Sequence, residues 1–259
     1  MPIGPKRLPF FQHLAELRQR MVIIILTIVV GSSVLYFDPF FSVILGWVLA
    51  PIDQLIPGGK LNVFGPFESF TFRFKVALFA SIVVFSPVII WQIMAFFLPA
   101  LKPNERKWFV PSFAASVLLF VSGAAFAYYV IMTPAFTFMF AQGGDLVSLI
   151  PSADKFLTGI GLLLVGFGMA FEIPILVFYA IGFGLIPYAK LRENWRYVYT
   201  GLAIIAAVAT PDWSPVTMGA LGGSLLALYE GSLVLARIVF SKRIKEQQLA
   251  LTESTESTE

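Results

Sequence analysis

The 259-residue sequence lacks residues on which much protein chemistry depends. It has no cysteine, which excludes disulfides, thiolate nucleophiles and zinc–thiolate sites. Its single histidine, His13, excludes a metal site built from several histidines. Neither common glycine-rich phosphate loop is present, and no apolar run contains a histidine that could activate an intramembrane serine. We therefore expect a protein that is not an enzyme and that holds no metal or cofactor.

Charge is also scarce, because only 13% of the residues are charged and 58% are hydrophobic. A soluble domain of average composition is about 25% charged. The polar residues of this chain cannot cover the surface of a soluble fold, so lipid must be its solvent. We expect an all-α integral membrane protein. No cleavable signal peptide is expected, because the first apolar run lacks a small-residue cleavage site and further apolar runs follow it.

The apolar runs predict one membrane domain over residues 1–245. A helix needs roughly 20 apolar residues to cross a bilayer. The expected spans are 21–37, 76–101, 108–132, 156–183, 197–210 and 216–236. The ten-residue run FSVILGWVLA, in the first external loop, is too short to span and predicts an interfacial helix. The acidic, low-complexity segment 246–259 predicts a disordered tail.

Two further features of the expected topology concern a loop and a pair of short spans. The long segment from Thr133 to Lys155 is expected to be a loop, and Pro87 is expected to kink the second span. The fifth and sixth runs are short enough to form one re-entrant hairpin. We interpret them as two spans, because Pro211, Asp212 and Pro215 predict a turn between them.

The lysines and arginines predict the orientation. Six spans place both termini on one side, and the cytoplasmic side of a membrane protein carries the excess of Lys and Arg. The side of the termini collects fourteen of them and the other side four, namely Lys60, Arg73, Lys75 and Lys155. Both termini are therefore expected in the cytoplasm.

The opening stretch FFQHLAELRQR predicts an amphipathic helix beside the first span. At helical spacing, His13, Glu16 and Arg20 share one arc, and Arg18 lies on another face. One interpretation is an ordinary helix with Glu16 paired to Arg20 at i,i+4. The other is a carboxylate displayed to bind a cationic ligand, because carboxylates pair with guanidinium groups in bidentate fashion.

Four further acidic residues can have functional or ordinary structural roles. Glu105, in the turn KPNERK, is a second carboxylate on the basic side, or an ordinary solvated loop charge. Glu172 lies mid-span, where an ionised carboxylate is costly, so it should face the interior, be neutral or meet a polar partner. It is a functional group or a satisfied core residue. Glu230 lies closer to the cytoplasmic end and could snorkel, and Asp212 suits a cap or turn.

Four segments together resemble one family. FFQHLAELRQR is similar to the F-x-x-H-L-x-E-L-R-x-R start of TatC, the multispan receptor of the twin-arginine protein translocase, and SPVIIWQIMAFFLPALKPNER resembles a second block of that family. PSADKFLTGIGLLLVGFGMAFEIPI and ATPD are similar to its fourth span and to the turn after its fifth. The chain departs from the family pattern at Trp91, where Tyr is usual, and at Met94, where Trp is usual.

The resemblance implies a concave, glove-shaped six-span receptor that binds twin-arginine signal peptides of folded cargo and catalyses no reaction. It implies that Glu16 and Glu105 contact the two signal arginines, with four residues nearby: Arg18, Arg20, Phe96 and Leu101. His13 matches the family pattern without a further assigned role.

The resemblance also implies partners and a location. Glu172 would offer a polar contact to single-span TatA/TatB-type subunits, and Pro51 and Asp212 match positions that matter for function. It implies transport driven by the proton-motive force in a prokaryotic cytoplasmic (inner) membrane, self-association in a receptor complex, and no nucleic-acid partner. Two alternatives stay open: a proton-coupled secondary transporter with Glu172 as proton carrier, and a membrane scaffold without peptide specificity.

Overall fold

The computed structural model describes residues 10–56, 60–97, 109–142, 151–182, 186–210 and 214–241. Within these ranges the regular structure is helical, apart from one isolated bridge between Asn62 and Ser152. The helices are α1 (Phe10–Tyr36), α2 (Phe40–Leu49), the 3-10 helix η1 (Asp53–Leu55), α3 (Pro66–Val84), α4 (Ser86–Phe97), α5 (Phe109–Phe126), the π-helix η5 (Ala127–Ile131), α6 (Met132–Ala141), α7 (Ala153–Ala170), α8 (Ile173–Gly182), α9 (Tyr188–Glu193), α10 (Trp195–Ala209) and α11 (Pro215–Val239).

Four helical segments of the described chain are long and apolar enough to cross a membrane: His13–Tyr36, Phe109–Ala141, Ala153–Gly182 and Pro215–Val239. The pair α3 and α4 makes a fifth if its two bent parts count as one span. The apolar helices α2 and α10 are shorter. The expectation of an all-α, multi-pass membrane protein is therefore confirmed at four to five long spans, and the count of six stays a prediction.

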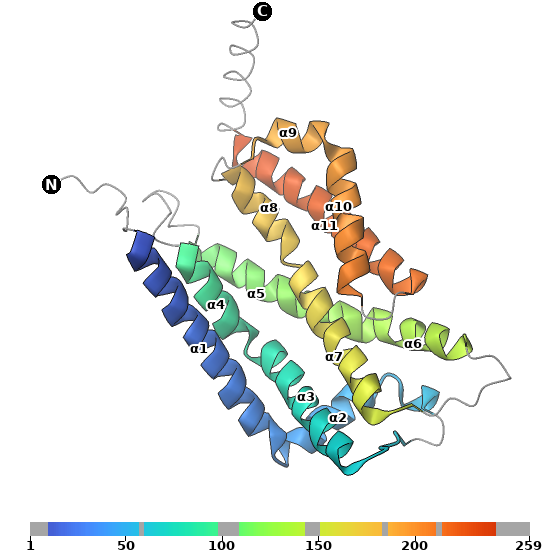
Figure 1. Cartoon of the computed structure of the whole chain (residues 1–259). Coiled ribbons are helices and arrows are strands. Elements are labelled where there is room, and N and C mark those ends of the chain that lie inside the picture. The colour runs from blue at the N-terminus through green and yellow to red at the C-terminus, as the bar shows by residue number, and fades with distance from the viewer. Residues whose placement is uncertain are drawn as a thin grey trace, which may run out of the picture.

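The helices form two groups joined by α5 and α7 (Figure 1). In the first group α1 packs on α3 and α4, and α3 packs on α7. In the second group α11 packs on α8 and α10. α1 begins and α11 ends at the same end of the bundle, which we call the N-terminal face, and α2 lies at the other end, the opposite face (Figure 1).

The second expected span is broken into two helices. α3 already begins at Pro66, before the expected start at residue 76, because Gly65 is its N-cap and a proline suits the first helical position. The chain then bends by 58° between α3 and α4. The break falls at Phe85, just ahead of Pro87, whose missing N–H is tolerated in the first turn of α4. The expected kink is thus confirmed.

The expected loop after residue 132 was wrong over residues 133–141, which are helical as the greater part of α6. Three residues of α6 at positions i, i+3 and i+4 are buried: Met132, Ala135 and Phe136. Met132 and Phe136 belong to a core cluster with residues of α2 and α7, and Ala135 belongs to a cluster with residues of α7. Burial of this apolar face offsets the conformational entropy that is lost when residues 133–141 become helical. The predicted tail 246–259 lies outside the described residues.

Polar contacts tie the helices together at the opposite face. The Arg73 guanidinium on α3 contacts the Asp38 carboxylate at 2.5 Å and donates to the Tyr36 carbonyl at 3.0 Å. The hydrogen bond from Arg73 holds the pKa of Asp38 below its usual value. The Lys75 ammonium lies 2.7 Å from the Asp154 carboxylate, which joins α3 to α7. These contacts fix α3 between α1 and α7.

Candidate functional site

A cluster of polar and aromatic side chains joins the first half of α1 to α4 near the N-terminal face. Two nitrogens of Arg20, Nη2 and Nε, contact Glu16 Oε1 at 2.6 and 3.1 Å. Arg20 Nη1 lies 3.4 Å from Gln92 Oε1 on α4. The His13 ring stacks on Phe96, with 4.3 Å between ring centroids and 19° between planes. The cluster therefore consists of a carboxylate, a guanidinium, an amide and a stacked ring pair.

The sequence produces this arrangement through helical spacing on two antiparallel helices. Glu16 and Arg20 are one turn apart on α1, as are Gln92 and Phe96 on α4, so each pair shares a helix face. His13 meets Phe96 and Arg20 meets Gln92, as expected for helices that run in opposite directions. The bend before α4 separates this contact from the packing of α3 on α1.

The structure brings together four of the predicted site residues, His13, Glu16, Arg20 and Phe96. Arg18 is exposed on another face of α1, as its helical position predicts. Glu105 and Leu101 lie outside the described residues, so the expected approach of the Glu105 carboxylate to that of Glu16 stays a prediction.

Gln92 was not predicted as a site residue. The signal for it was available, because Gln92 lies one helical turn before Phe96 within the quoted segment SPVIIWQIMAFF. An amide oxygen at that position is a suitable acceptor for a guanidinium from α1.

Glu172 lies at the break between α7 and α8, two residues ahead of Pro174. Its Oε2 accepts a hydrogen bond from the hydroxyl of Ser116 on α5, which is buried. Its Oε1 is buried and has no hydrogen-bond partner among the described residues. The predicted polar partner therefore exists for one carboxylate oxygen, and the other is buried without a partner among the described residues.

Glu230 on α11 is held by two neighbouring helices. Arg192 Nη1 of α9 contacts its two oxygens at 2.8 and 3.1 Å, and the Tyr199 hydroxyl of α10 donates to Oε1 at 2.6 Å. The hydrogen bond to Glu230 raises the pKa of Arg192. That the carboxylate could snorkel towards the membrane surface stays a prediction, and the structure shows Glu230 joining α11 to α9 and α10.

The two remaining predicted residues belong to connecting segments. The Pro51 carbonyl, after α2, accepts a hydrogen bond from Thr133 Oγ1 of α6 at 3.2 Å. Pro51 thus fixes the segment after α2 to α6. Asp212 lies outside the described residues.

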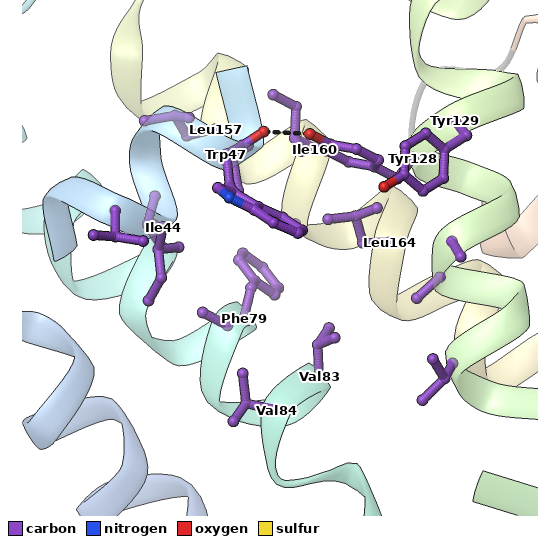
Figure 2. Close-up of a pocket in the computed structure, with 18 residues that line it drawn as sticks. Ile44, Trp47, Phe79, Val83, Val84, Tyr128, Tyr129, Leu157, Ile160 and Leu164 are labelled. Atoms are coloured by element: carbon purple, nitrogen blue, oxygen red, sulfur yellow. Dashed lines mark hydrogen bonds between the residues drawn. The ribbon is translucent and has the colours of Figure 1, made fainter. Parts of the chain in front are cut away.

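An apolar pocket of about 480 Å³ lies between α3 and α5, with α7 behind it and α2 at one end (Figure 2). The side chains that line it include Trp47, Phe79, Tyr128 and Leu164. The Tyr128 hydroxyl donates a hydrogen bond to the Trp47 carbonyl at 2.5 Å. Among the described residues that line this pocket there is no carboxylate, lysine, arginine or histidine. It is suited to apolar groups and not to a charged solute.

No metal site is built from the part of the chain that the structure describes. Within it, no group of three or more His, Asp or Glu side chains lies close enough to hold a metal ion.

Comparisons with known proteins identify the family. Residues 12–223 match the family model of the Sec-independent protein translocase protein (TatC). The TatC protein of Carboxydothermus hydrogenoformans is 31% identical over 94% of this chain and 98% of its own length. The TatC protein of Aquifex aeolicus is 32% identical over 94% of this chain and the whole of its own.

A solved structure has the same fold. The crystal structure of a twin arginine translocase receptor, TatC, superposes with a TM-score of 0.71 at 30% identity, over 86% of this chain and 99% of the crystallised one. The chain therefore belongs to the TatC family of Sec-independent protein translocase proteins, which are multi-pass membrane components of protein transport.

Proposed function

We propose that this chain is the receptor subunit of a twin-arginine translocase and binds twin-arginine signal peptides through carboxylates at its N-terminal face. The main support for this proposal is the position of the Glu16 carboxylate. This carboxylate is paired with Arg20 near the N-terminal face, and 23% of the Glu16 side chain is exposed. Both contacts from Arg20 go to Oε1, and Oε2 has no partner among the described residues. A guanidinium from a peptide can reach that oxygen.

Glu105 is the second carboxylate of the proposal, paired with the second signal arginine. Two carboxylates at a fixed separation favour a pair of arginines over lysines, because an ammonium lacks the planar fork of a guanidinium. Phe96, stacked on His13, would pack against apolar residues of the same peptide. Arg18, Arg20 and Leu101 complete the proposed peptide site.

The proposed topology has six spans with both termini in the cytoplasm of a prokaryote, and the N-terminal face is its cytoplasmic side. The beginning of α1 and the end of α11 lie at the same end of the bundle, which supports an even number of crossings (Figure 1). Basic residues of the described chain gather there on α1, α9, α10 and α11: Arg18, Arg20, Lys190, Arg192, Arg196 and Arg237. This pattern follows the excess of positive charge on cytoplasmic loops.

Glu172 is the proposed contact for single-span TatA/TatB-type partners within the membrane. Its buried, unpaired Oε1 suits a polar group on a partner helix, because an unsatisfied acceptor in hydrocarbon is costly. In this proposal the subunit recognises cargo, associates with further copies and organises the partners. The proton-motive force drives the export of folded proteins.

Photo-crosslinking of a twin-arginine peptide to inner-membrane vesicles tests the peptide site. Glu16→Ala and Glu105→Gln should each weaken the crosslink while the receptor still inserts at normal levels. Unchanged crosslinking to both variants would refute the proposed site. Solute uptake that depends on pH, in vesicles containing this protein alone, would instead support a proton-coupled transporter with Glu172 as carrier.

A further inference from the structure

The contact between Arg20 and Glu16 is one-sided. Nη2 and Nε of Arg20 both reach Oε1, so the guanidinium occupies one oxygen and leaves Oε2 open. The third contact, from Nη1 to Gln92 Oε1, is long at 3.4 Å. Arg20 thus lies between two acceptors and is bound tightly to only one of them.

We propose that Arg20 is an internal competitor for the peptide's guanidinium, and that Gln92 is the acceptor that receives Arg20 when the peptide binds. This inference rests on the proposed function. A peptide arginine approaches Oε2 of Glu16, takes the carboxylate in bidentate fashion and releases Arg20 from Oε1. The Arg20 guanidinium then moves the short distance to Gln92 Oε1 and closes the hydrogen bond that is long in the free receptor.

The exchange lowers the affinity of the site for any peptide cation that must displace Arg20. A peptide arginine replaces one guanidinium by another, so the carboxylate keeps two charge-assisted hydrogen bonds. A peptide lysine displaces the same guanidinium and offers a single point charge in return. Because both peptides displace the same competitor, Arg20 lowers their affinities by one common factor, and the preference for arginine comes from the geometry of its pair with Glu16.

Equilibrium binding to the full-length receptor in detergent tests this, with fluorescently labelled twin-arginine and Lys-Lys versions of one signal peptide. Arg20→Gln removes the competitor and should raise the affinities for both peptides about tenfold, the factor that one charge-assisted hydrogen bond supplies, and leave their ratio unchanged. Arg20→Lys keeps the charge and removes the fork, so both affinities should rise by less. A sharp, unshifted gel-filtration peak confirms that each variant is folded.

Arg237→Gln is the matched control, because it removes the same charge from an exposed position of the N-terminal face outside the proposed peptide site. It should leave the affinities for both peptides close to the wild-type values. Affinities in Arg20→Gln and Arg20→Lys equal to those in Arg237→Gln would overturn the inference while leaving the proposed function intact. Weaker binding of the twin-arginine peptide by Arg20→Gln would likewise overturn it. A wild-type receptor that does not distinguish the two peptides would reject the proposed function itself.

Discussion

Ser116 of α5 donates a hydrogen bond to Glu172 where the fourth span is broken between α7 and α8. Ser116 is only 3% exposed, so the hydroxyl is a fixed donor inside the bundle. The bond satisfies Oε2 and leaves Oε1 buried without a partner among the described residues. This half-satisfied carboxylate is the feature that the proposed partner contact uses.

Replacing Glu172 should therefore disturb assembly more than peptide recognition. In Glu172→Ala we expect the single-span partners to be lost from affinity-purified receptor, because the buried acceptor is removed. Binding of the twin-arginine peptide should be unchanged, since the proposed peptide site uses Glu16 of α1 and not Glu172. Glu172→Gln keeps an acceptor for Ser116 and should retain part of the partner signal. Normal co-purification with Glu172→Ala would contradict the proposed contact.

The packing of α7 on α10 depends on the absence of a side chain at Gly166. A Cβ there would lie 2.7 Å from the Ala209 carbonyl oxygen, which is backbone and cannot rotate away. Gly166→Ala should lower the free energy of unfolding by about 1–3 kcal/mol, the usual cost of overpacking. Thermal unfolding of the detergent-solubilised protein measures this.

Gly159 is the matched control for that measurement. It lies on the same helix, and a Cβ built there has nothing within 4 Å. Gly159→Ala should be neutral or slightly stabilising, because alanine has the higher helix propensity. Equal destabilisation by both substitutions would show that the close contact with α10 is not the cause.

The hydrogen bond between Tyr128 and the Trp47 carbonyl ties α2 to the third span at the apolar pocket (Figure 2). Tyr128→Phe should reduce stability by about 0.5–1.5 kcal/mol, the net value of one hydrogen bond. Tyr129→Phe removes the neighbouring hydroxyl from a side chain that is 71% exposed and should have no effect. A shift in melting temperature as large in Tyr129→Phe as in Tyr128→Phe would contradict this role.

Much of the fold could be predicted from the sequence, because the apolar runs are long and the bilayer sets the length of a span. The sequence could not show where these apolar runs would bend, break into two helices or extend further. The bend at Phe85 and the extension of α6 past residue 132 depend on which neighbouring helices bury each turn. Such tertiary packing overrides local signals such as the Thr-Pro pair at the start of the expected loop.

The site could be predicted only in part. The position of Glu16 beside Arg20 follows from i,i+4 spacing on one helix. The contacts of Arg20 with Gln92 and of His13 with Phe96 required the register of α1 against α4, which no local pattern contains. For the same reason, neither Ser116 as the partner of Glu172 nor Arg192 as that of Glu230 was predicted.

The central claim is that carboxylates at the N-terminal face select arginine. The most direct measurement is equilibrium binding of a twin-arginine signal peptide and of its Lys-Lys version to the purified wild-type receptor in detergent. We predict that the Lys-Lys peptide binds at least about tenfold more weakly than the twin-arginine peptide, because lysine cannot form the bidentate pair. Equal affinities for the two peptides would contradict it.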